Sequence, residues 1–513
     1  MPSPRPPRRP RIRDELGLPK SLPDGHRVLR PSVAGRWLVL GLGPDPAGLA
    51  AVLAGPGGLP PGAVSFMECP DFAAQCPPEW RASIPADWTA LPPHNDTAHA
   101  PDLSALARLW ADPGVGVALY SGAQRLFPDF WGPVLAALAL PDPAILPGKS
   151  GRTVLLPQGA GTLLTRELSL AFSQAGFAVE DPAETPLEHA LRQGAPELFF
   201  SVNFAGLDDH GQGYHLLRRA GTRVATWLVD NPFHALSRLK SRFWQRMPLF
   251  VTDASFLPLL RAHGARDVHH LPLAAGQHFF DATPDRPDLE GRLLFVGRSA
   301  FPGREDFFAG EILPPDTLRQ ALAMLEAGER PDFLWWTRTL NLDALWPGKA
   351  VRRAGLGAEE CGQALRARVI EAASRAGRLS VCGDDAWRDL AAGHYALLPP
   401  VDYYGPLAGM YASARCVLGA TSPLLPAGLT QRHFDVWAAG GCLLSDATPG
   451  LELFPRELIE PITYRAPADI PHALARLERD RQGLTTAWRE RIARDHTYDR
   501  RVALVLDALS DGD

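Results

Sequence analysis

The sequence predicts an α/β protein built from three units in which strands and helices alternate. Continuous apolar runs bounded by Gly and Pro recur along the chain, as expected for parallel strands that are buried on both faces. Amphipathic segments between these runs suit the helices that connect parallel strands by right-handed crossovers. A length of 513 residues also suggests about three domains, at roughly 150 residues per domain.

The composition is that of a folded protein with many loops. Hydrophobic residues make up 46% and charged residues 21% of the chain, which are ordinary values. The 47 Gly and 51 Pro are an excess, and they predict many turns. A formal net charge of −5 excludes an overall nucleic-acid-binding charge pattern, and no apolar run reaches the roughly 20 residues of a membrane helix. We therefore expect a cytoplasmic protein with no integral membrane segment and no nucleic-acid partner.

The first unit is predicted to be a small accessory domain. Residues 1–28 are basic and Pro-rich, and we interpret them as a disordered tail. Residues 29–145 are predicted to form a Rossmann-like α/β domain with a helix near 103–111. The strands expected in this domain lie at 36–43, 64–68 and 115–120.

The accessory domain carries a weak cofactor signal. Gly41 and Gly43 follow its first strand and Glu68 ends the second, which is similar to the glycine-rich turn and ribose acid of a Rossmann or methyltransferase domain. However, Pro44 and Pro46 stiffen the turn and remove N–H groups that a ligand would use. We favour a degenerate domain over a working cofactor site.

The second unit, residues 152–285, is predicted to be a parallel α/β domain with polar residues at its strand ends. Asn203 and Asp230 each follow a strand, at the sheet edge where such folds bind ligands. Asp230 is the candidate general base at this edge, and His210, whose ordinary pKa lies near neutral, is the alternative. The strands expected in this domain lie at 153–157, 197–202, 223–229, 249–252 and 268–271.

The third unit, residues 286–513, is predicted to be a second parallel α/β domain that ends in a charged amphipathic helix at 484–509. A further long helix is expected at 358–376. The strands expected here lie at 292–297, 379–383, 395–398, 416–419 and 442–445.

The strongest motif of the third unit runs from Gly428 to a buried strand. Gly428 lets the backbone approach a ligand closely. The helix that starts at residues 430–432 is expected to offer free N–H groups to phosphate. Gln431 and Asp435 are four residues apart and so share one helix face, where a carboxylate can accept hydrogen bonds from ribose hydroxyls.

This segment resembles the C-terminal half of GT-B glycosyltransferases, in particular the CgeB-like (spore maturation protein) group. The resemblance rests on an arginine, an aromatic residue, an acid and then glycine before a buried strand, from Arg432 to Gly441. It implies that Asp435 takes the place of the ribose-binding glutamate, and that Arg432 and the loop at Gly428 face the nucleotide diphosphate. Two departures are Asp435 itself, one methylene shorter than Glu, and Ala427, which stands where many retaining enzymes have a second glutamate.

Other segments extend the resemblance over roughly residues 152–505. It implies two Rossmann-like domains of the GT-B type that face a cleft, preceded by the smaller Rossmann-like domain. Asn203 and Asn231 are then expected to bind the acceptor. The residues expected to bind the donor are Gly297, Arg298, Tyr404, Gly405, Gly428, Gln431, Arg432 and Asp435.

The implied activity is transfer of a sugar from a nucleotide diphosphate sugar to an acceptor hydroxyl on a surface glycan or protein. The donor is a substrate, and neither a cofactor nor a metal site is expected. Two alternatives stay open from the residues alone. One is an S-adenosylmethionine-dependent methyltransferase or cofactor binder that uses the first domain. The other is a non-catalytic nucleotide-sugar-binding scaffold, which Ala427 keeps open.

Overall fold

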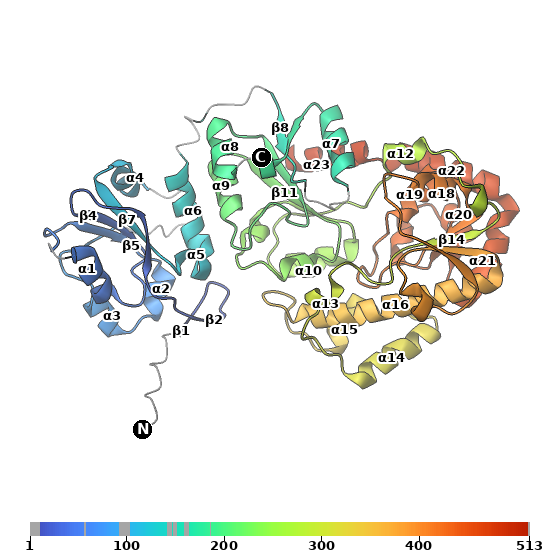
Figure 1. Cartoon of the computed structure of the whole chain (residues 1–513), viewed down its shortest axis with the longest axis horizontal. Helices are drawn as coiled ribbons and strands as arrows, with labels where there is room; N and C mark the ends of the chain where they lie inside the picture. The colour runs from blue at the N-terminus through green and yellow to red at the C-terminus, as the bar shows by residue number, and fades with distance from the viewer. Residues whose placement is uncertain are drawn as a thin grey trace.

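The protein forms three α/β units that lie side by side in chain order (Figure 1). The computed structural model describes residues 11–55, 58–91, 103–140, 146, 151–158, 164–184 and 186–510. Two six-stranded, fully parallel sheets follow a smaller five-stranded sheet. The predicted fold class is therefore confirmed, with one correction to the smaller unit.

The smaller sheet is mixed rather than Rossmann-like throughout, because its edge strand β3 runs antiparallel to β7. Its strand order is β3-β7-β4-β5-β6, and the other neighbouring pairs are parallel. The strands are β3 (His26–Arg30), β4 (Arg36–Leu40), β5 (Val64–Met67), β6 (Thr89–Ala90) and β7 (Val115–Tyr120). The helices are α1 (Pro46–Ala54), α2 (Pro70–Gln75), α3 (Pro78–Ala82), α4 (Ser104–Ala111), α5 (Ala123–Leu126) and α6 (Pro128–Ala139).

The prediction of a disordered tail over residues 1–28 is wrong for its second part. Residues 1–10 lie outside the described residues, but β1 (Arg11–Arg13) and β2 (Pro19–Ser21) form an antiparallel pair. Ile12 and Leu22 are buried in the core of the smaller unit. These apolar side chains, spaced between basic ones, anchor a segment whose overall composition indicates disorder.

The middle sheet has the order β13-β12-β11-β10-β8-β9. Its strands are β8 (Thr153–Leu155), β9 (Ala178–Glu180), β10 (Leu198–Val202), β11 (Arg223–Leu228), β12 (Leu249–Val251) and β13 (Val268–His270). Its helices are α7 (Thr165–Gln174), α8 (Leu187–Gln193), α9 (Gln212–Arg219), α10 (Pro232–Leu236) and α11 (Leu257–Ala262). The order reverses between β8 and its neighbours, which places a ligand crevice at the carboxyl ends of β8, β10 and β11.

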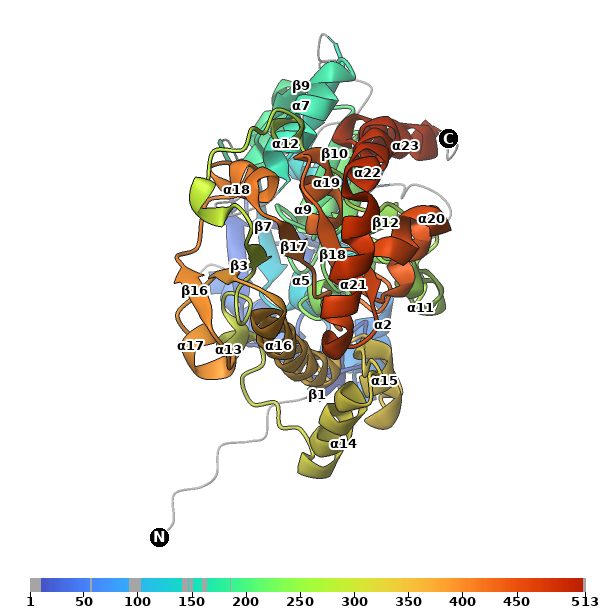
Figure 2. The same ribbon diagram turned by 90° about the vertical axis from the view of Figure 1, so that its right-hand side faces the viewer.

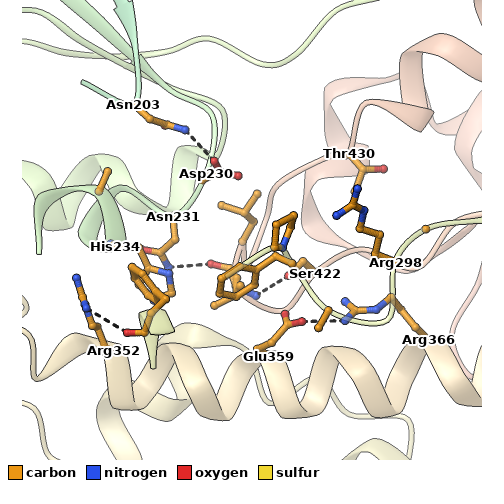
Figure 3. Close-up of a pocket in the computed structure, with 18 of the residues that line it drawn as sticks. Asn203, Asp230, Asn231, His234, Arg298, Arg352, Glu359, Arg366, Ser422 and Thr430 are labelled. Carbon is orange, nitrogen blue, oxygen red and sulfur yellow. Dashed lines mark hydrogen bonds and ion pairs between the residues drawn. The ribbon is translucent and has the colours of Figure 1, made fainter. Parts of the chain in front are cut away.

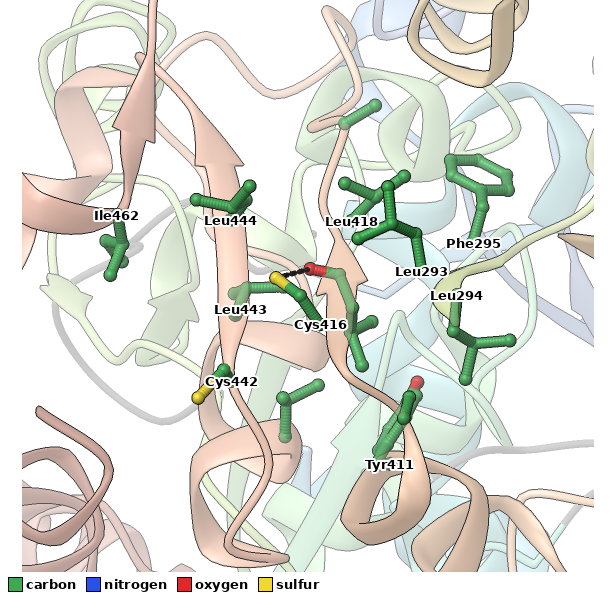
Figure 4. Close-up of a cluster of buried hydrophobic side chains, with 14 of the residues drawn as sticks. Leu293, Leu294, Phe295, Tyr411, Cys416, Leu418, Cys442, Leu443, Leu444 and Ile462 are labelled. Atoms are coloured by element: carbon green, nitrogen blue, oxygen red, sulfur yellow. Dashed lines mark hydrogen bonds between the residues drawn. The ribbon is translucent and has the colours of Figure 1, made fainter. Parts of the chain in front are cut away.

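The third sheet has the order β16-β15-β14-β17-β18-β19. Its strands are β14 (Leu293–Val296), β15 (Leu379–Cys382), β16 (Tyr395–Leu398), β17 (Cys416–Leu418), β18 (Leu443–Asp446) and β19 (Thr463–Tyr464). The strands at its centre are buried on both faces, and their apolar side chains pack into one core (Figure 4). This is why they read as continuous apolar runs in the sequence.

Helices surround the third sheet and extend toward the middle one (Figure 2). They are α12 (Gln277–Phe280), α13 (Arg304–Phe307), α14 (Pro315–Glu326), α15 (Phe333–Thr339), α16 (Val351–Ala376), α17 (Trp387–Leu390), α18 (Leu407–Ser413), α19 (Arg432–Ala438), α20 (Arg456–Ile459), α21 (Ile470–Leu477), α22 (Arg481–Asp495) and α23 (Tyr498–Ser510). No helix within the described ranges is long and apolar enough to span a membrane.

The last predicted helix, residues 484–509, is two helices in the structure. The chain breaks after α22 and continues as α23, which crosses to the middle sheet and packs against α7 (Figure 1). Val502 and Val505 lie in a core that they share with the middle sheet. Arg501 fixes the crossing by donating to the Pro272 and Leu273 carbonyls at 2.6 and 2.9 Å.

Helices α15 and α16 follow the predicted domain boundary at residue 286, yet they pack into the core of the middle sheet. Trp336, Val351 and Cys361, from α15 and α16, are buried in the same core as residues of the middle sheet. The division in sequence therefore does not coincide with the division between cores. Packed helices therefore join the two parallel sheets, which also face each other across a cavity.

Candidate active site between the two parallel sheets

A cavity of about 840 Å³ lies where the carboxyl ends of the two parallel sheets face each other (Figure 3). Asn203 and Asp230, which follow β10 and β11, line it from the middle sheet. Gly297 and Arg298, which follow β14, and Arg432 at the start of α19 line it from the third sheet. Its volume is within the roughly 300–1,000 Å³ of small-molecule sites. The structure thus brings together six predicted site residues, the sixth being Asn231.

Asn203 is held in an unusual backbone conformation that aims its side chain at Asp230. Asn203 and Phe204 have backbone φ values of 51° and 60°, in the left-handed region that residues other than Gly rarely adopt. The Asn203 Oδ1 accepts from the Val229 N–H at 3.0 Å, and its Nδ2 donates to the Asp230 Oδ2 at 2.7 Å. Backbone strain of this kind persists where the surroundings enforce it, as at many functional sites.

Asp230 is the carboxylate best placed to act as a base in the cavity. Its side chain is open to the cavity, while the protein around it withdraws water and raises its pKa. The hydrogen bond from Asn203 opposes this rise without cancelling it. A carboxylate with a raised pKa is a stronger base than an ordinary exposed aspartate.

Asn231 lines the cavity, but both ends of its amide are already bound. Its Oδ1 caps α10 by accepting from the Phe233 and His234 N–H groups, and its Nδ2 donates to the Leu424 carbonyl at 3.0 Å. The side chain is 2% exposed. Asn231 joins α10 to the loop after β17 through these bonds, and its predicted contact with the acceptor stays a prediction.

The other end of the cavity carries positive charge without a carboxylate partner. Among the described residues, neither Arg298 nor Arg432 forms an ion pair with Asp or Glu. A Cβ on Gly297 would lie 3.1 Å from the Arg432 Nη2, so glycine gives the guanidinium room to pass. The Arg432 guanidinium lies 5.9 Å from the centroid of the Phe295 ring. Two such groups suit a bound diphosphate.

The remaining arginines of the cavity are already neutralised or packed. Arg238 pairs with Asp209 at 2.6 Å, and Arg366 pairs with Glu359 at 2.9 Å. Arg352 lies over the Phe307 ring at 4.2 Å, and burial lowers its pKa. Sequence reasoning missed the three residues from α16, Arg352, Glu359 and Arg366, although their spacing of seven residues repeats on one helix face.

The start of α19 differs from the expected open helix end. The Thr430 N–H donates to the His433 Nδ1 at 3.1 Å, so it is not free for a ligand. Burial lowers the pKa of His433 to about 4, which keeps the ring neutral and able to accept that bond. Gly428 shapes the preceding turn, because a Cβ there would lie 2.6 Å from the Leu425 Cβ. Gly428 does not line the cavity.

The third unit packs against α7 of the middle unit around Glu167, and we call this contact the seam. Asp435 is buried at the seam and does not line the cavity. It is 1% exposed and accepts from the Tyr403 hydroxyl at 2.9 Å and from the Gln431 Nε2 at 3.1 Å. Burial raises its pKa well above the usual range. Gln431 also accepts from the Tyr498 hydroxyl at 3.3 Å. Asp435 and Gln431 are thus bound to protein groups and do not line the cavity, and their contacts with a donor stay predictions.

Tyr404 and Gly405 belong to the same seam and not to the cavity lining. The Tyr404 hydroxyl donates to the Glu167 Oε2 at 2.7 Å, which links the third unit to α7 of the middle one. Gly405 has ordinary contacts with Asp402 and requires no special conformation. The sequence pattern could not show that the Tyr404 side chain turns toward the middle unit, because such a contact depends on how the units pack.

His210, the alternative base, lies outside the cavity lining. It is half-buried in the loop before α9, where its N–H donates to the Asp208 Oδ1 at 3.0 Å. Burial lowers its pKa. The prediction of a catalytic role for His210 therefore finds no support in its position.

The glycine turn of the smaller sheet is filled by the protein's own carboxylate. The Glu68 Oε2 accepts from the Leu42 N–H at 2.7 Å, and its Oε1 accepts from the Cys69 N–H at 2.7 Å. A Cβ on Gly43 would lie 2.8 Å from the Tyr120 ring. Burial raises the pKa of Glu68 to about 7. The turn therefore offers no open N–H cradle of the kind that binds a cofactor phosphate.

In the part of the chain that the structure describes, no group of three or more His, Cys, Asp or Glu is placed to hold a metal ion. The six cysteines are free thiols, and five of them are buried.

Comparison with known proteins agrees with a glycosyltransferase-like third unit. Residues 363–507 match the profile of a family described as "Glycosyl transferase-like", which covers less than half of the chain. No curated protein matches in sequence.

Several solved structures are similar at low identity. An α-glucosyltransferase in complex with UDP-glucose and DNA is 11% identical, with 71% of this chain and 100% of that chain covered and a TM-score of 0.43. Anabaena Alr3699/HepE in complex with UDP-glucose is 10% identical, with 70% and 99% covered and a TM-score of 0.43. The α,α-trehalose 6-phosphate synthase of Burkholderia multivorans is 12% identical, with 93% and 98% covered and a TM-score of 0.34. These TM-scores are low, so the fold rests on this chain's own strand order.

Proposed function

We propose that the protein is a GT-B-type glycosyltransferase that moves a sugar from a nucleotide diphosphate sugar to an acceptor hydroxyl on a surface glycan or protein. One observation carries the proposal. A single cavity between two parallel sheets holds, at one end, two guanidiniums that form no ion pair with a carboxylate of the described residues and, at the other, a carboxylate with a raised pKa. The motif from Arg432 to Gly441 favours the CgeB-like group within this class.

The donor would lie against the third sheet. Arg298 and Arg432 would bind the diphosphate, and Gly297 would let the backbone come close to it. Their charge would stabilise the leaving diphosphate without a metal ion. Gln431, Asp435, Tyr404, Gly405 and Gly428 would then support this side of the site. A direct donor contact by Asp435 or Tyr404 would require the seam with Glu167 to open.

The acceptor would lie against the middle sheet, with Asn203 fixing the orientation of Asp230. Asp230 would take the proton of the acceptor hydroxyl as its oxygen bonds to the anomeric carbon of the sugar. The bond from that carbon to the diphosphate oxygen would break, and its electron pair would leave with the diphosphate. Enclosure between the two sheets would limit access of water, which competes with the acceptor for the sugar.

The alternative of a methyltransferase or cofactor binder in the first unit is not supported, because Glu68 occupies the glycine turn. The non-catalytic scaffold differs from an enzyme only in turnover. Mass spectrometry of donor and acceptor panels separates the two: an enzyme releases nucleotide diphosphate and adds one sugar mass to an acceptor.

Isothermal titration with UDP- and GDP-sugars tests donor binding. We expect the wild type to bind one of them and Arg432→Gln to bind it at least tenfold more weakly, which is about 1.4 kcal/mol. Arg388→Gln is the matched control, since Arg388 is an exposed arginine of the same unit that pairs with Asp385. Equal affinity of the two variants, or no binding by the wild type, would contradict the proposal.

A further inference from the structure

Part of the cavity wall between its two ends is apolar, and it lies in the same lining as the polar side chains of α16. The segment after β14 contributes two half-buried phenylalanines, Phe301 and Phe307, and the exposed Pro302. The loop after β17 adds the half-buried Leu424 and Leu425. We call these five residues the apolar wall.

The apolar wall is fixed in place by its own packing. The Phe301 and Phe307 rings meet edge to face, with centroids 6.0 Å apart. The His234 ring lies 5.0 Å from Phe307, and burial lowers the pKa of His234 to about 3, so this neighbour is neutral as well. Gly355 of α16 makes room for His234, because a Cβ there would lie 2.0 Å from the His234 Nε2. The wall is therefore built by contacts from three elements.

The position of the wall determines which substrate meets it. In Figure 3, Asn203 and Asp230 lie at one side of the cavity and Arg298 and Thr430 at the other. The Leu424 carbonyl accepts from Asn231, the residue that follows Asp230, and the Phe307 ring contacts His234 of α10. These two parts of the wall therefore adjoin the acceptor side, while Phe301 follows Arg298 by three residues and extends the wall toward the donor end. A group bound against the two parts on the acceptor side would be next to the hydroxyl that Asp230 deprotonates.

The chemistry of the wall does not suit a diphosphate or a ligand that presents only hydroxyls. Hydroxyls that lose water need hydrogen-bond partners, and the five side chains of the wall offer none. Half-buried phenylalanines around an open cavity gain free energy when an apolar surface covers them, by about 25 cal/mol per Å². Aromatic side chains also pair well with a second ring, edge to face or offset.

We infer that the acceptor carries its reactive hydroxyl beside an apolar, ring-bearing group, which packs on the apolar wall while Asp230 meets the hydroxyl. This inference rests on the proposed transferase function and names the class of its acceptor. A surface glycan or protein would qualify through an aryl group next to the acceptor hydroxyl.

Two probe pairs, each with one small and one aryl member, test the inference on the full chain saturated with UDP. The pairs are methyl and phenyl β-glucoside, and N-acetylserinamide and N-acetyltyrosinamide. We expect the aryl member of at least one pair to bind at least tenfold more tightly than its partner. Phe301→Ser should remove that preference, whereas Phe301→Leu should keep most of it because the side chain stays apolar. Leu390→Ser, at an exposed leucine of α17, is the control and should leave it unchanged.

Thermal unfolding of each variant separates a lost contact from a lost fold, and Phe301→Leu covers the case in which Phe301→Ser unfolds. Equal binding within both pairs, or no binding by either aryl probe, overturns the inference. An aryl probe that binds the nucleotide-free chain but not the UDP-saturated chain also overturns the inference, because the wall would then belong to the nucleotide. Failure of the proposed function looks different, since the protein would then not bind a nucleotide sugar at all.

Discussion

The molecule has two glycine turns that each follow a strand with parallel neighbours, one after β4 and one after β14. They differ in the groups that lie next to the turn. In the smaller sheet, Gly41 and Gly43 follow β4, and Glu68 occupies the N–H groups of the turn. In the third sheet, Gly297 follows β14 and opens onto the cavity beside two arginines. Similar local sequences therefore lead to one closed turn and one open site. The difference lies in the neighbouring side chains.

The largest expected effect is on the chemistry at the open site. Asp230→Asn keeps the shape of the side chain but removes the base, so turnover should fall by about 10²–10⁴-fold. Donor affinity should change less than twofold, because Asp230 lies at the end of the cavity away from Arg298. Initial rates and titrations on the same samples measure both. Asp389→Asn, in the exposed part of α17, is the control. Full activity of Asp230→Asn would remove the assigned base.

At the closed turn, loss of the carboxylate should act on stability. Glu68→Ala leaves the Leu42 and Cys69 N–H groups without their acceptor. Burying two unsatisfied donors should cost about 2–4 kcal/mol of unfolding free energy, measured by chemical denaturation. Nucleotide-sugar binding should stay within twofold of wild type. A stable variant that loses donor binding would show that the turn, and not the cavity, is the nucleotide site.

The raised pKa of Glu68 predicts a pH dependence at the same turn. Its folded-state pKa of about 7 lies above the ordinary value of 4.5, so the folded state holds the proton more tightly between these values. The stability that this group contributes should therefore fall as pH rises from about 4.5 to about 7, by about 3 kcal/mol, and then level off. The difference in unfolding free energy between wild type and Glu68→Gln, followed across this range, isolates the effect. A difference that is constant with pH, or that grows in favour of wild type, would contradict it.

Arg298 should contribute less than the base does. Arg298→Gln removes one of two guanidiniums that face the donor end, so donor affinity should fall about tenfold, or about 1.4 kcal/mol. Because the pairing is electrostatic, the loss should shrink as salt concentration rises. Titrations at two salt concentrations measure this. An unchanged affinity at low salt would show that Arg298 does not meet the diphosphate.

The smallest expected effect is that of a chelator. We predict that transfer in excess EDTA stays within twofold of the untreated rate, since arginine charge is proposed to stabilise the leaving group. A loss of rate that Mg²⁺ or Mn²⁺ restores would show that a metal ion takes part.

Much of the fold could be predicted from local sequence, because strands buried on both faces are continuous apolar runs. The runs at 115–120 and 223–229 coincide closely with β7 and β11. The crossing of α23 was not predictable in this way. Its break after α22 and its packing on α7 depend on contacts with residues more than 300 positions earlier in the chain.

The lining of the cavity was predictable only at the ends of strands. Asn203, Asp230 and Gly297 were predicted to share one site because parallel strands place the residues that follow them at one sheet edge, and all three line the cavity. Asp435 and Tyr404 were predicted from the motif to contact the donor. The Asp435 side chain instead bonds to Tyr403 within the third unit, and the Tyr404 side chain bonds to Glu167 of the middle unit. The apolar wall was missed because Phe301 and Phe307 carry no motif and acquire their role only when the two sheets face each other.

Hydrogen exchange with and without a saturating nucleotide sugar shows which of the two glycine turns meets the nucleotide, because it reports on both in one experiment. We predict slower exchange of backbone amides at residues 296–300 and 420–432 and no change at 41–45. Protection at 41–45 with none at 296–300 would contradict it and would place the nucleotide in the smaller sheet.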